Sequence, residues 1–590
     1  MKLIRCSNRS RIGRAVNRQD DGFVAVMVAI LMPVIFGITA FSVDVANWYS
    51  TIGDIQRAAD AAALAGVPYM PSDLAGAKAQ ALATATANGF TDSSTVTVDP
   101  EPVSGNPSQL QVTITKTVDN TFLQIFGQDT TTIRRTAIAT YQAPLPMGSP
   151  CNEYGNGPDP LLTATSVQSS NCTSTGQFWA NVGSPKAAKS YGDAYQDGNC
   201  ATSAAGTDNC SDSNSDYSSN GYFYQIKLSA AVSNLTIQAF DPAFVSVGDT
   251  CASNFGSGST AAVYAKNQYN YDASTSATAA SYTEDSNLYG SGSANQYCTG
   301  DMLYTDVSDQ PPDTTYTIRQ QVASSNPWDP TSYPVVGSCT QTFTGFSGDL
   351  YTALNQYKQD SNNKVQYAGG SPQLAAAGTS GYNATVASEF RQWVTLCTFD
   401  GTASAGTYFV QVQTNAAADN SNGDGHNRFS IRAFGSNASD DANIEISGYT
   451  FMGVYANLPS AQTTFYLTQV PPAAAGQILD LRFFDIGDSE GSGTVTVEPP
   501  SDSNASSFSG CVGSGPTSGA LSGCSIPANS TYNGKWETIS IPIPAGYTCD
   551  SASPTGCWIT LTYNYGSGNQ PSDTTSWAAS LEGTPVRITT

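Results

Sequence analysis

The sequence predicts a mainly β protein: a transmembrane helix and an alanine-rich helical stalk, a small β-rich module, then two antiparallel β-sandwich domains of jelly-roll-like type. Three observations predict this class: a run of 21 uncharged residues near the N-terminus, alanine-rich segments with helical spacing after it, and short alternating strands beyond. A chain of 590 residues also exceeds what one hydrophobic core usually organises. The expected domain ranges are 1–22 (basic cytoplasmic segment), 23–43 (transmembrane helix), 44–90 (helical stalk), 91–143 (small α+β module), 144–420 (β-sandwich with a long insertion) and 421–590 (second β-sandwich).

The uncharged run, Phe23 to Val43, is long enough to cross a lipid bilayer once. At about 1.5 Å of rise per residue it spans roughly 31 Å, close to the thickness of the hydrocarbon layer. It is longer than the apolar core of a signal peptide, and Asp44 to Trp48 offers no small-residue cleavage site. We therefore expect a retained, single-pass anchor that contacts the lipid bilayer.

The distribution of charge predicts the orientation of this anchor. The first 21 positions hold six of the 24 basic residues and two of the 47 acidic ones, which leaves 18 basic and 45 acidic residues beyond them. The positive-inside rule places the N-terminus in the cytoplasm and the bulk of the chain outside. The acidic remainder shows no basic cluster, which argues against a nucleic-acid partner.

Two alanine-rich helices are expected to follow the membrane. The first continues the transmembrane helix as far as Gly66, because bulky and alanine side chains recur at helical spacing. The second runs from an N-cap at Ser72 to a C-cap at Gly89. Their shallow apolar faces suit packing within the chain, and self-association or docking on a partner helix is the alternative.

The segment Gln56–Gly66, QRAADAAALAG, follows an apolar helix that ends near Asp44. This combination resembles the N-terminal region of TadE/TadG-like proteins of the Flp pilus, or tight-adherence, assembly system. The resemblance covers roughly residues 18–90. It implies a membrane-anchored component that acts with other pilus-assembly or envelope proteins in assembly, anchoring or surface interaction, without catalysis.

One position departs from the pseudopilins related to this family, which carry a glycine followed, at the fifth mature position, by a glutamate. Counting from Gly22, the fifth position here is Met27. The resemblance therefore favours a TadG-like anchor that is not cleaved over a TadE-like subunit that is released and polymerised.

Beyond the stalk, residues 95–141 alternate with period two and contain a short helical turn at Thr121–Phe126, so a small β-rich spacer is expected. The two sandwiches are expected to be related. Leu235–Asp241 and Leu479–Asp485 share the pattern L-x-[IL]-x-x-F-D, and a tryptophan-containing strand follows each. The separations differ, so the first copy should carry an insertion that includes residues 251–298.

Thirteen cysteines divide into Cys6, before the anchor, and an even set of twelve beyond it. An even set in an oxidising compartment predicts disulfides, although the sequence does not fix their connectivity. Three nearest-neighbour pairs are the candidates: Cys200 with Cys210, Cys511 with Cys524, and Cys549 with Cys557.

A calcium ion is the only cofactor for which the sequence offers candidates. Asp485, Asp488 and Glu490 lie on one predicted strand-end loop, where hard oxygen ligands could gather around calcium. Asp241 and Asp249 are their counterparts in the other copy. A solvated acidic loop without a metal is the alternative.

Little in the sequence suggests an enzyme. His426 is the single histidine, which excludes an H-E-x-x-H zinc site, and a Ser-His-Asp triad would need this residue, which lies in a predicted polar loop. No pair of carboxylates stands out for glycoside hydrolysis. The alternative to a pilus-assembly component is a membrane-tethered adhesin or carbohydrate-binding protein, whose tryptophans would stack on surface glycans. The tryptophans in question are Trp179, Trp328, Trp393, Trp536, Trp558 and Trp577.

Overall fold

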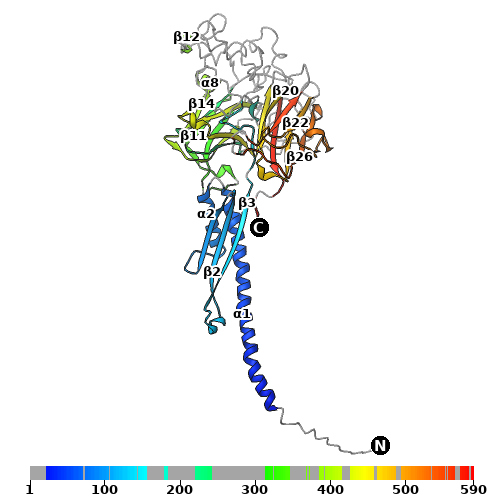
Figure 1. Ribbon diagram of the computed structural model, residues 1–590. Helices are drawn as coiled ribbons and strands as arrows, with labels where there is room; N and C mark the ends of the chain where they lie inside the picture. Colours follow the sequence, from blue (N-terminus) through cyan, green and yellow to red (C-terminus); the bar gives the residue numbers. More distant parts are fainter. Residues whose placement is uncertain are drawn as a thin grey trace, which may run out of the picture. The chain divides into compact units, whose positions relative to one another are not determined.

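The computed structural model describes the chain in two compact units (Figure 1). Unit 1 comprises Met1–Gln142 and Pro585–Thr590, and unit 2 comprises Ala143–Thr584. The described residues are 21–70, 73–104, 106–142, 144–155, 178–183, 220–241, 313–322, 325–327, 329–345, 367–368, 371–372, 384–390, 393–414, 426–457, 462–486, 493–532, 535–551, 553, 556–564, 572–583 and 586–589.

Unit 1 packs two helices against a four-stranded antiparallel sheet with the strand order β1-β2-β3-β29. The sheet contributes buried Leu110, Val112 and Ile114, which alternate along β2 as a half-buried strand requires. Its elements are α1 (Asp21–Gly66), η1 (Val67–Tyr69), α2 (Leu74–Ala87), β1 (Val96–Val103), β2 (Asn106–Asp119), η2 (Leu123–Phe126), β3 (Thr130–Tyr141) and β29 (Val586–Ile588).

The alanine-rich second part of α1 forms the core of unit 1. Ile55, Ala58, Ala59, Ala62 and Ala63 are all at most 1% exposed and recur at intervals of three and four residues. They belong to one hydrophobic cluster with residues of α2 and the sheet. Of the two interpretations of the alanine-rich faces, packing within the chain is the one that the structure shows.

The N-cap of helix α2 lies one residue later than predicted. Asp73 is its N-cap, and its carboxylate accepts a hydrogen bond of 2.8 Å from the backbone N–H of Gly76. The expected cap, Ser72, lies outside the described residues. Asp serves as well as Ser here because the side chain of either residue supplies an oxygen that accepts a hydrogen bond from a free N–H group of the first helical turn.

Strand β29 closes unit 1 from the other end of the chain. It pairs antiparallel with β3, with Val586 opposite Tyr141, and Thr589 donates its backbone N–H to the carbonyl of Ile138 at 2.8 Å. Unit 2 is therefore inserted between two adjacent strands of the unit 1 sheet.

Ten strands form the first large sheet of unit 2, and neighbouring strands in it are antiparallel. In order they are β11 (Val335–Phe343), β10 (Thr314–Gln320), β16 (Gly406–Thr414), β7 (Tyr222–Leu228), β18 (Ile444–Tyr449), β4 (Pro146–Met147), β20 (Gln462–Gln469), β27 (Trp558–Asn564), β22 (Gly493–Glu498) and β25 (Ser525–Ala528).

The second large sheet has eleven strands, and β5 (Glu153–Tyr154) joins it by pairing with β17. The others, in order, are β14 (Trp393–Thr398), β9 (Thr236–Phe240), β17 (His426–Phe434), β6 (Trp179–Gly183), β19 (Phe451–Asn457), β28 (Ser572–Leu581), β21 (Ile478–Phe484), β26 (Trp536–Pro542), β23 (Val512–Ser514) and β24 (Gly519–Ala520).

Short elements complete the described part of unit 2. Two small sheets pair β8 (Val232–Ser233) with β15 (Thr402–Ala403) and β12 (Tyr367–Ala368) with β13 (Ser371–Pro372). The helical turns are η4 (Pro330–Ser332), α8 (Ala384–Glu389), α9 (Ala438–Asp441), η5 (Pro472–Ala474), η6 (Ser522–Cys524) and η7 (Ser530–Tyr532).

Unit 2 consists of two halves, from β4 to β17 and from β18 to β28, with the same strand order. In the first half β9 pairs with β14 and β17, and β16 pairs with β7 and β10. In the second half β21 pairs with β26 and β28, and β27 pairs with β20 and β22, in the same sequence along the chain. Trp393 lies opposite Phe240 as Trp536 lies opposite Phe484. The repeated sequence pattern thus occupies equivalent strands.

The two halves are not separate sandwiches divided at residue 420. Strand β18, from the second half, pairs with β7 of the first, and β4, from the first half, pairs with β20 of the second. The halves also meet directly through β4 with β18 and β6 with β19. Both sheets therefore run across the expected border, and one hydrophobic cluster draws residues from both halves.

Much of the extra length of the first half lies in two connections between consecutive strands. Residues 241–313 link β9 to β10, where the second half uses only 485–492 between β21 and β22. Residues 344–392 link β11 to β14, where the second half uses 529–535 between β25 and β26. The expected insertion, including residues 251–298, falls in the first of these connections and lies outside the described residues.

We predict that Gly66→Ala destabilises unit 1. A Cβ atom at this position would lie 2.6 Å from the carbonyl oxygen of Ala77 and 2.6 Å from a methyl group of Leu110. Such overpacking typically costs about 1–3 kcal/mol. The matched control is Gly53→Ala in the same helix, where the nearest atom is the end of the Arg57 side chain at 3.8 Å.

The control should be neutral or stabilising by up to about 1 kcal/mol, because alanine favours helix more than glycine does. Thermal unfolding of the full-length protein in detergent measures both variants. Equal unfolding midpoints for the two substitutions would contradict the close approach at Gly66.

Candidate membrane-anchoring site

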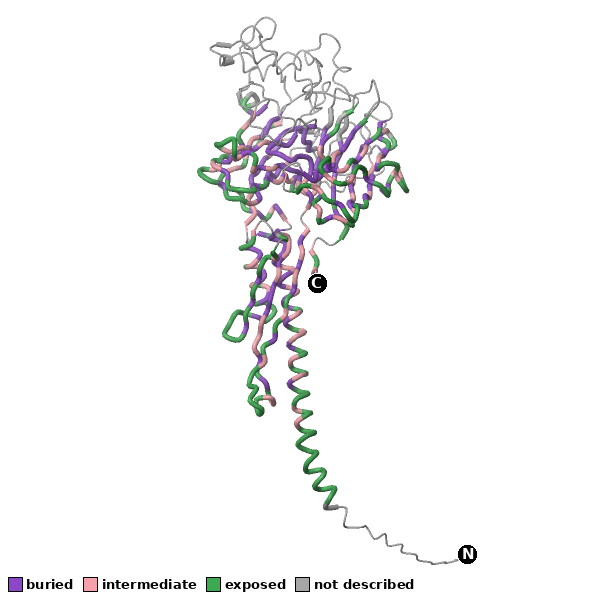
Figure 2. Tube along the Cα trace, in the orientation of Figure 1, coloured by how far each residue is buried: buried purple, intermediate pink, exposed green. Residues whose placement is uncertain are grey.

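The first part of α1 is an uncovered apolar helix. Its large side chains are mostly half or more exposed, for example Phe23 at 67%, Ile30 at 65% and Phe36 at 67% (Figure 2). By length and composition it is the one helix of the described chain that could cross a membrane. Thr39 and Ser42 donate their hydroxyls to carbonyls one turn earlier, both at 2.8 Å, so these polar groups are satisfied within the helix.

Asp44 marks the point at which α1 changes its surroundings. Its side chain is 1% exposed, and its carboxylate accepts three backbone hydrogen bonds, from Thr121, Phe122 and Leu123, at 2.8 to 2.9 Å. These N–H groups lie at the start of η2, where a helical turn leaves donors without partners. The carboxylate therefore fixes the β2–β3 connection to α1 directly beyond the apolar run.

Aromatic side chains gather at the same level of the helix. The Trp48 indole N–H donates to the side-chain oxygen of Asn120 at 3.0 Å, and the ring of Phe41 packs edge-on against Trp48 with centroids 6.4 Å apart. Tyr49 is 71% exposed. Tryptophan and tyrosine are enriched where a membrane-spanning helix leaves the hydrocarbon layer, because one end of each ring is apolar and the other is polar.

The acidic residues predicted as calcium ligands are buried where they are described. Asp485 follows β21 with a left-handed backbone (φ 58°) and is 0% exposed, and Asp241 follows β9 and is 1% exposed. Asp488, Glu490 and Asp249 lie outside the described residues. No group of three metal-ligating side chains occurs within the described part of the chain. Calcium binding stays a prediction.

Two of the three neighbouring cysteine pairs lie in the described chain, and both are disulfide-bonded: Cys511 with Cys524 and Cys549 with Cys557. Cys200 and Cys210 lie outside the described residues. A third bond joins Cys339 of β11 to Cys397 of β14. Nearest-neighbour pairing misses this bond because its cysteines are 58 residues apart and come together only across the two sheets.

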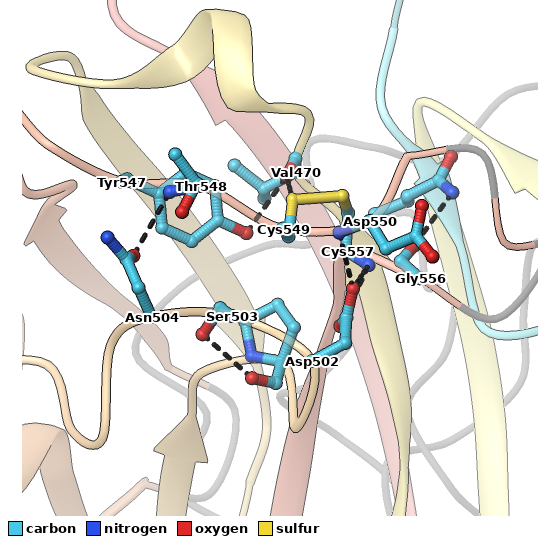
Figure 3. The surroundings of a disulfide bond; sticks show 12 residues. Val470, Asp502, Ser503, Asn504, Tyr547, Thr548, Cys549, Asp550, Gly556 and Cys557 are labelled. Carbon is cyan, nitrogen blue, oxygen red and sulfur yellow. Dashed lines mark hydrogen bonds between the residues drawn. A yellow bond between two sulfur atoms is a disulfide. The ribbon is translucent and has the colours of Figure 1, made fainter.

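The Cys549–Cys557 bond lies in a loop that one carboxylate organises (Figure 3). Asp502 accepts the backbone N–H of Asp550 at 2.7 Å and that of Cys557 at 3.1 Å. The Tyr547 hydroxyl donates to the carbonyl of Val470 at 3.0 Å. The buried bond from Tyr547 ties this loop to the end of β20, and the bonds to Asp502 tie it to the segment after β22.

The candidate residues for catalysis and glycan stacking lie in strands where the structure describes them. His426 is the first residue of β17 and pairs with Gly183, in a strand where the sequence predicts a loop. Trp179, Trp558 and Trp577 are at most 3% exposed, so their faces are not open to a sugar. Trp328 lies outside the described residues.

The two partly exposed tryptophans, Trp393 and Trp536, each carry a guanidinium group over the ring. The centre of Arg432 lies 4.1 Å from the Trp393 centroid, and that of Arg482 lies 4.4 Å from the Trp536 centroid. These cation–π contacts cover one face of each ring. The two tryptophans lie on equivalent strands, β14 and β26, whereas Arg432 comes from β17 and Arg482 from β21. Each ring thus packs against an arginine of its own half, which indicates a packing role for the tryptophans.

A buried carboxyl group next to Trp536 escaped sequence analysis. Glu537 is 0% exposed and accepts the backbone N–H of Thr517 at 3.0 Å. Burial raises the pKa of this carboxyl above its ordinary value, and the hydrogen bond from Thr517 offsets the rise only in part. Its only sequence signal is an acidic residue at an inward-facing position of an alternating strand.

Comparison with known proteins assigns the anchoring region. Residues 22–83 match the Flp pilus-assembly TadE/G-like family. The match covers nearly all of α1 and most of α2, including Asp44 and the alanine-rich packing face, and it does not reach unit 2. No curated protein and no solved structure matches the chain. The TadE/G-like region therefore coincides with the helix that changes from exposed and apolar to packed.

We predict that Asp44→Ala releases η2 from the TadE/G-like helix. Three backbone N–H groups would lose their shared acceptor, at a cost of about 2 kcal/mol or more. Hydrogen exchange of the amides of residues 121–123 in the full-length protein should become about 30-fold faster, the equivalent of 2 kcal/mol. Asp54→Ala, on the exposed side of the same helix, is the control, since Asp54 pairs only with exposed Arg57. Unchanged exchange in Asp44→Ala would show that the carboxylate does not hold the turn.

We predict a pH-dependent stabilisation by Glu537→Gln. Folding raises the pKa of Glu537. The neutral carboxyl therefore contributes its full stabilisation below the unfolded-state pKa, and this contribution is lost as pH rises through the folded-state pKa. Glutamine stays neutral and still accepts the N–H of Thr517. The gain in thermal unfolding midpoint over the parent should be larger at pH 7.5 than at pH 4. The exposed Glu582→Gln serves as control, and a gain that does not grow with pH would contradict the prediction.

Proposed function

We propose that this protein is a single-pass envelope protein that acts in Flp pilus assembly without catalysis. Residues Phe23–Val43 would lie in the bacterial cell membrane, with the N-terminus in the cytoplasm and residues 44–590 on the extracytoplasmic side. The observation that carries the proposal is the change in α1 at Asp44, from exposed apolar helix to packed helix, within the region that matches the TadE/G-like family.

Charge and redox chemistry support this orientation. The six basic residues before the span favour a cytoplasmic N-terminus. Unit 2 contains three disulfides among its described cysteines, and such bonds form and persist in oxidising compartments outside the cytoplasm.

The continuity of α1 supports a retained anchor. One helix runs from Asp21 to Gly66, so the apolar part and the part packed in unit 1 are the same rigid element. Met27 takes the position at which processed pseudopilins carry glutamate. We infer that the chain stays whole and remains attached to the membrane, as in TadG-like proteins, and that units 1 and 2 contact other pilus-assembly or envelope proteins.

Membrane extraction and protease protection test the anchor and its orientation. After alkaline carbonate treatment the full-length protein should stay in the membrane pellet, because a single apolar helix holds it in the bilayer. Protease added to spheroplasts should degrade residues 44–590 and leave an N-terminal tag protected. Release by carbonate, or protection of residues 44–590, would contradict the proposal.

A gene-deletion strain tests the role in assembly. Loss of surface pili, restored by the full chain, is the expected result. A variant in which residue 142 is joined to 585 through Asn-Gly separates the roles of the two units, because it preserves the pairing of β29 with β3. Normal pili in the deletion strain would reject a role in pilus assembly.

A further inference from the structure

The connection between β2 and β3 exposes apolar side chains. Residues 120–128, NTFLQIFGQ, carry no charge and include η2. Ile125 is 76% exposed and Phe126 is 75% exposed, more than any large hydrophobic side chain of Phe23–Val43. The local fold does not require these residues, since the turn is ended by Gly127 in a left-handed conformation (φ 82°) and polar side chains would fit it equally well.

This tip lies beside the end of the apolar part of α1. The hydrogen bonds of 2.8 to 2.9 Å from Thr121, Phe122 and Leu123 to Asp44 place it next to the residue that directly follows the span. The bond from Trp48 to Asn120 is a second tie at the same level. Figure 1 shows the hairpin tip beside α1, and Figure 2 shows both the tip and the first part of the helix as exposed.

Two exposed apolar surfaces of unit 1 therefore lie next to each other. If the hydrocarbon layer ends near Asp44, the tip lies at the boundary between lipid headgroups and acyl chains. Apolar and aromatic side chains gain free energy by entering that boundary, as they do in interfacial membrane anchors. A basic residue is lacking between positions 120 and 128, so the contact depends on apolar burial and not on anionic headgroups.

We propose that the β2–β3 tip, residues 121–127, inserts into the bilayer interface and forms a second membrane contact beside the transmembrane helix. This proposal rests on the membrane placement of Phe23–Val43. Two contacts joined through Asp44 restrict the rotation and tilt of α1, which a single helix leaves free, and so set the orientation of the unit 1 sheet to the membrane plane.

Photocrosslinking of the full-length protein in dioleoylphosphatidylcholine vesicles tests the proposal. Three single variants carry benzoylphenylalanine, a photoreactive side chain that inserts into nearby C–H bonds: at Phe126 in the tip, at Phe36 in the span, and at Ser104. Ser104 is exposed in the β1–β2 turn, at the opposite end of β2. Both Phe126 and Ser104 are exposed, so neither variant disturbs the core.

Mass spectrometry after illumination should show lipid adducts at positions 36 and 126, with at least fivefold less at 104. Adducts at 36 but not at 126, or adducts of 126 with protein only, would overturn the tip proposal and leave the transmembrane helix standing. The absence of lipid adducts at position 36 would overturn both the span and the tip.

Discussion

The hydrogen bonds from residues 121–123 to Asp44 hold the sheet of unit 1 against α1, and the rest of unit 1 depends on this contact. Helix α1 has exposed apolar side chains along one part and packs against the rest of unit 1 along the other. A buried carboxylate is costly unless its oxygens are well paired, and backbone N–H groups at a helical turn supply that pairing without a cation. The position of this one residue therefore defines where the exposed helix ends and where the sheet must begin.

Small side chains on α1 make the remainder of unit 1 possible. Alanines at 58, 59, 62 and 63, and glycine at 66, let helix and sheet approach closely, with little volume to fill between them. Unit 2 is built differently. Its two topologically equivalent halves exchange their first strands, β4 and β18, and share one core. The exchange hides edges that two separate sandwiches would leave exposed to pairing with other chains.

The sequence predicts those features that depend on local pattern. Residues 23–43, the alanine-rich helices and the strands of the small module follow from composition and periodicity, and the match of residues 22–83 confirms the suspected family. Features that need distant partners do not follow. The Cys339–Cys397 bond, the exchange of β4 and β18, and the contact of Asp44 with a turn 77 residues later join segments that no short pattern connects. Asp44 was visible as the end of the apolar run, but its acceptor role was not.

Strand β29 completes the sheet of unit 1 only after the rest of the chain has been made. Synthesis delivers residues from the N-terminus onward, so α1, α2 and β1 to β3 are made long before residues 586–588. Until unit 2 has been made, the edge of β3 around Tyr141 lacks its partner β29. A chain that is interrupted anywhere in unit 2 leaves this edge open to pairing with other chains, so the open edge distinguishes an unfinished molecule from a complete one.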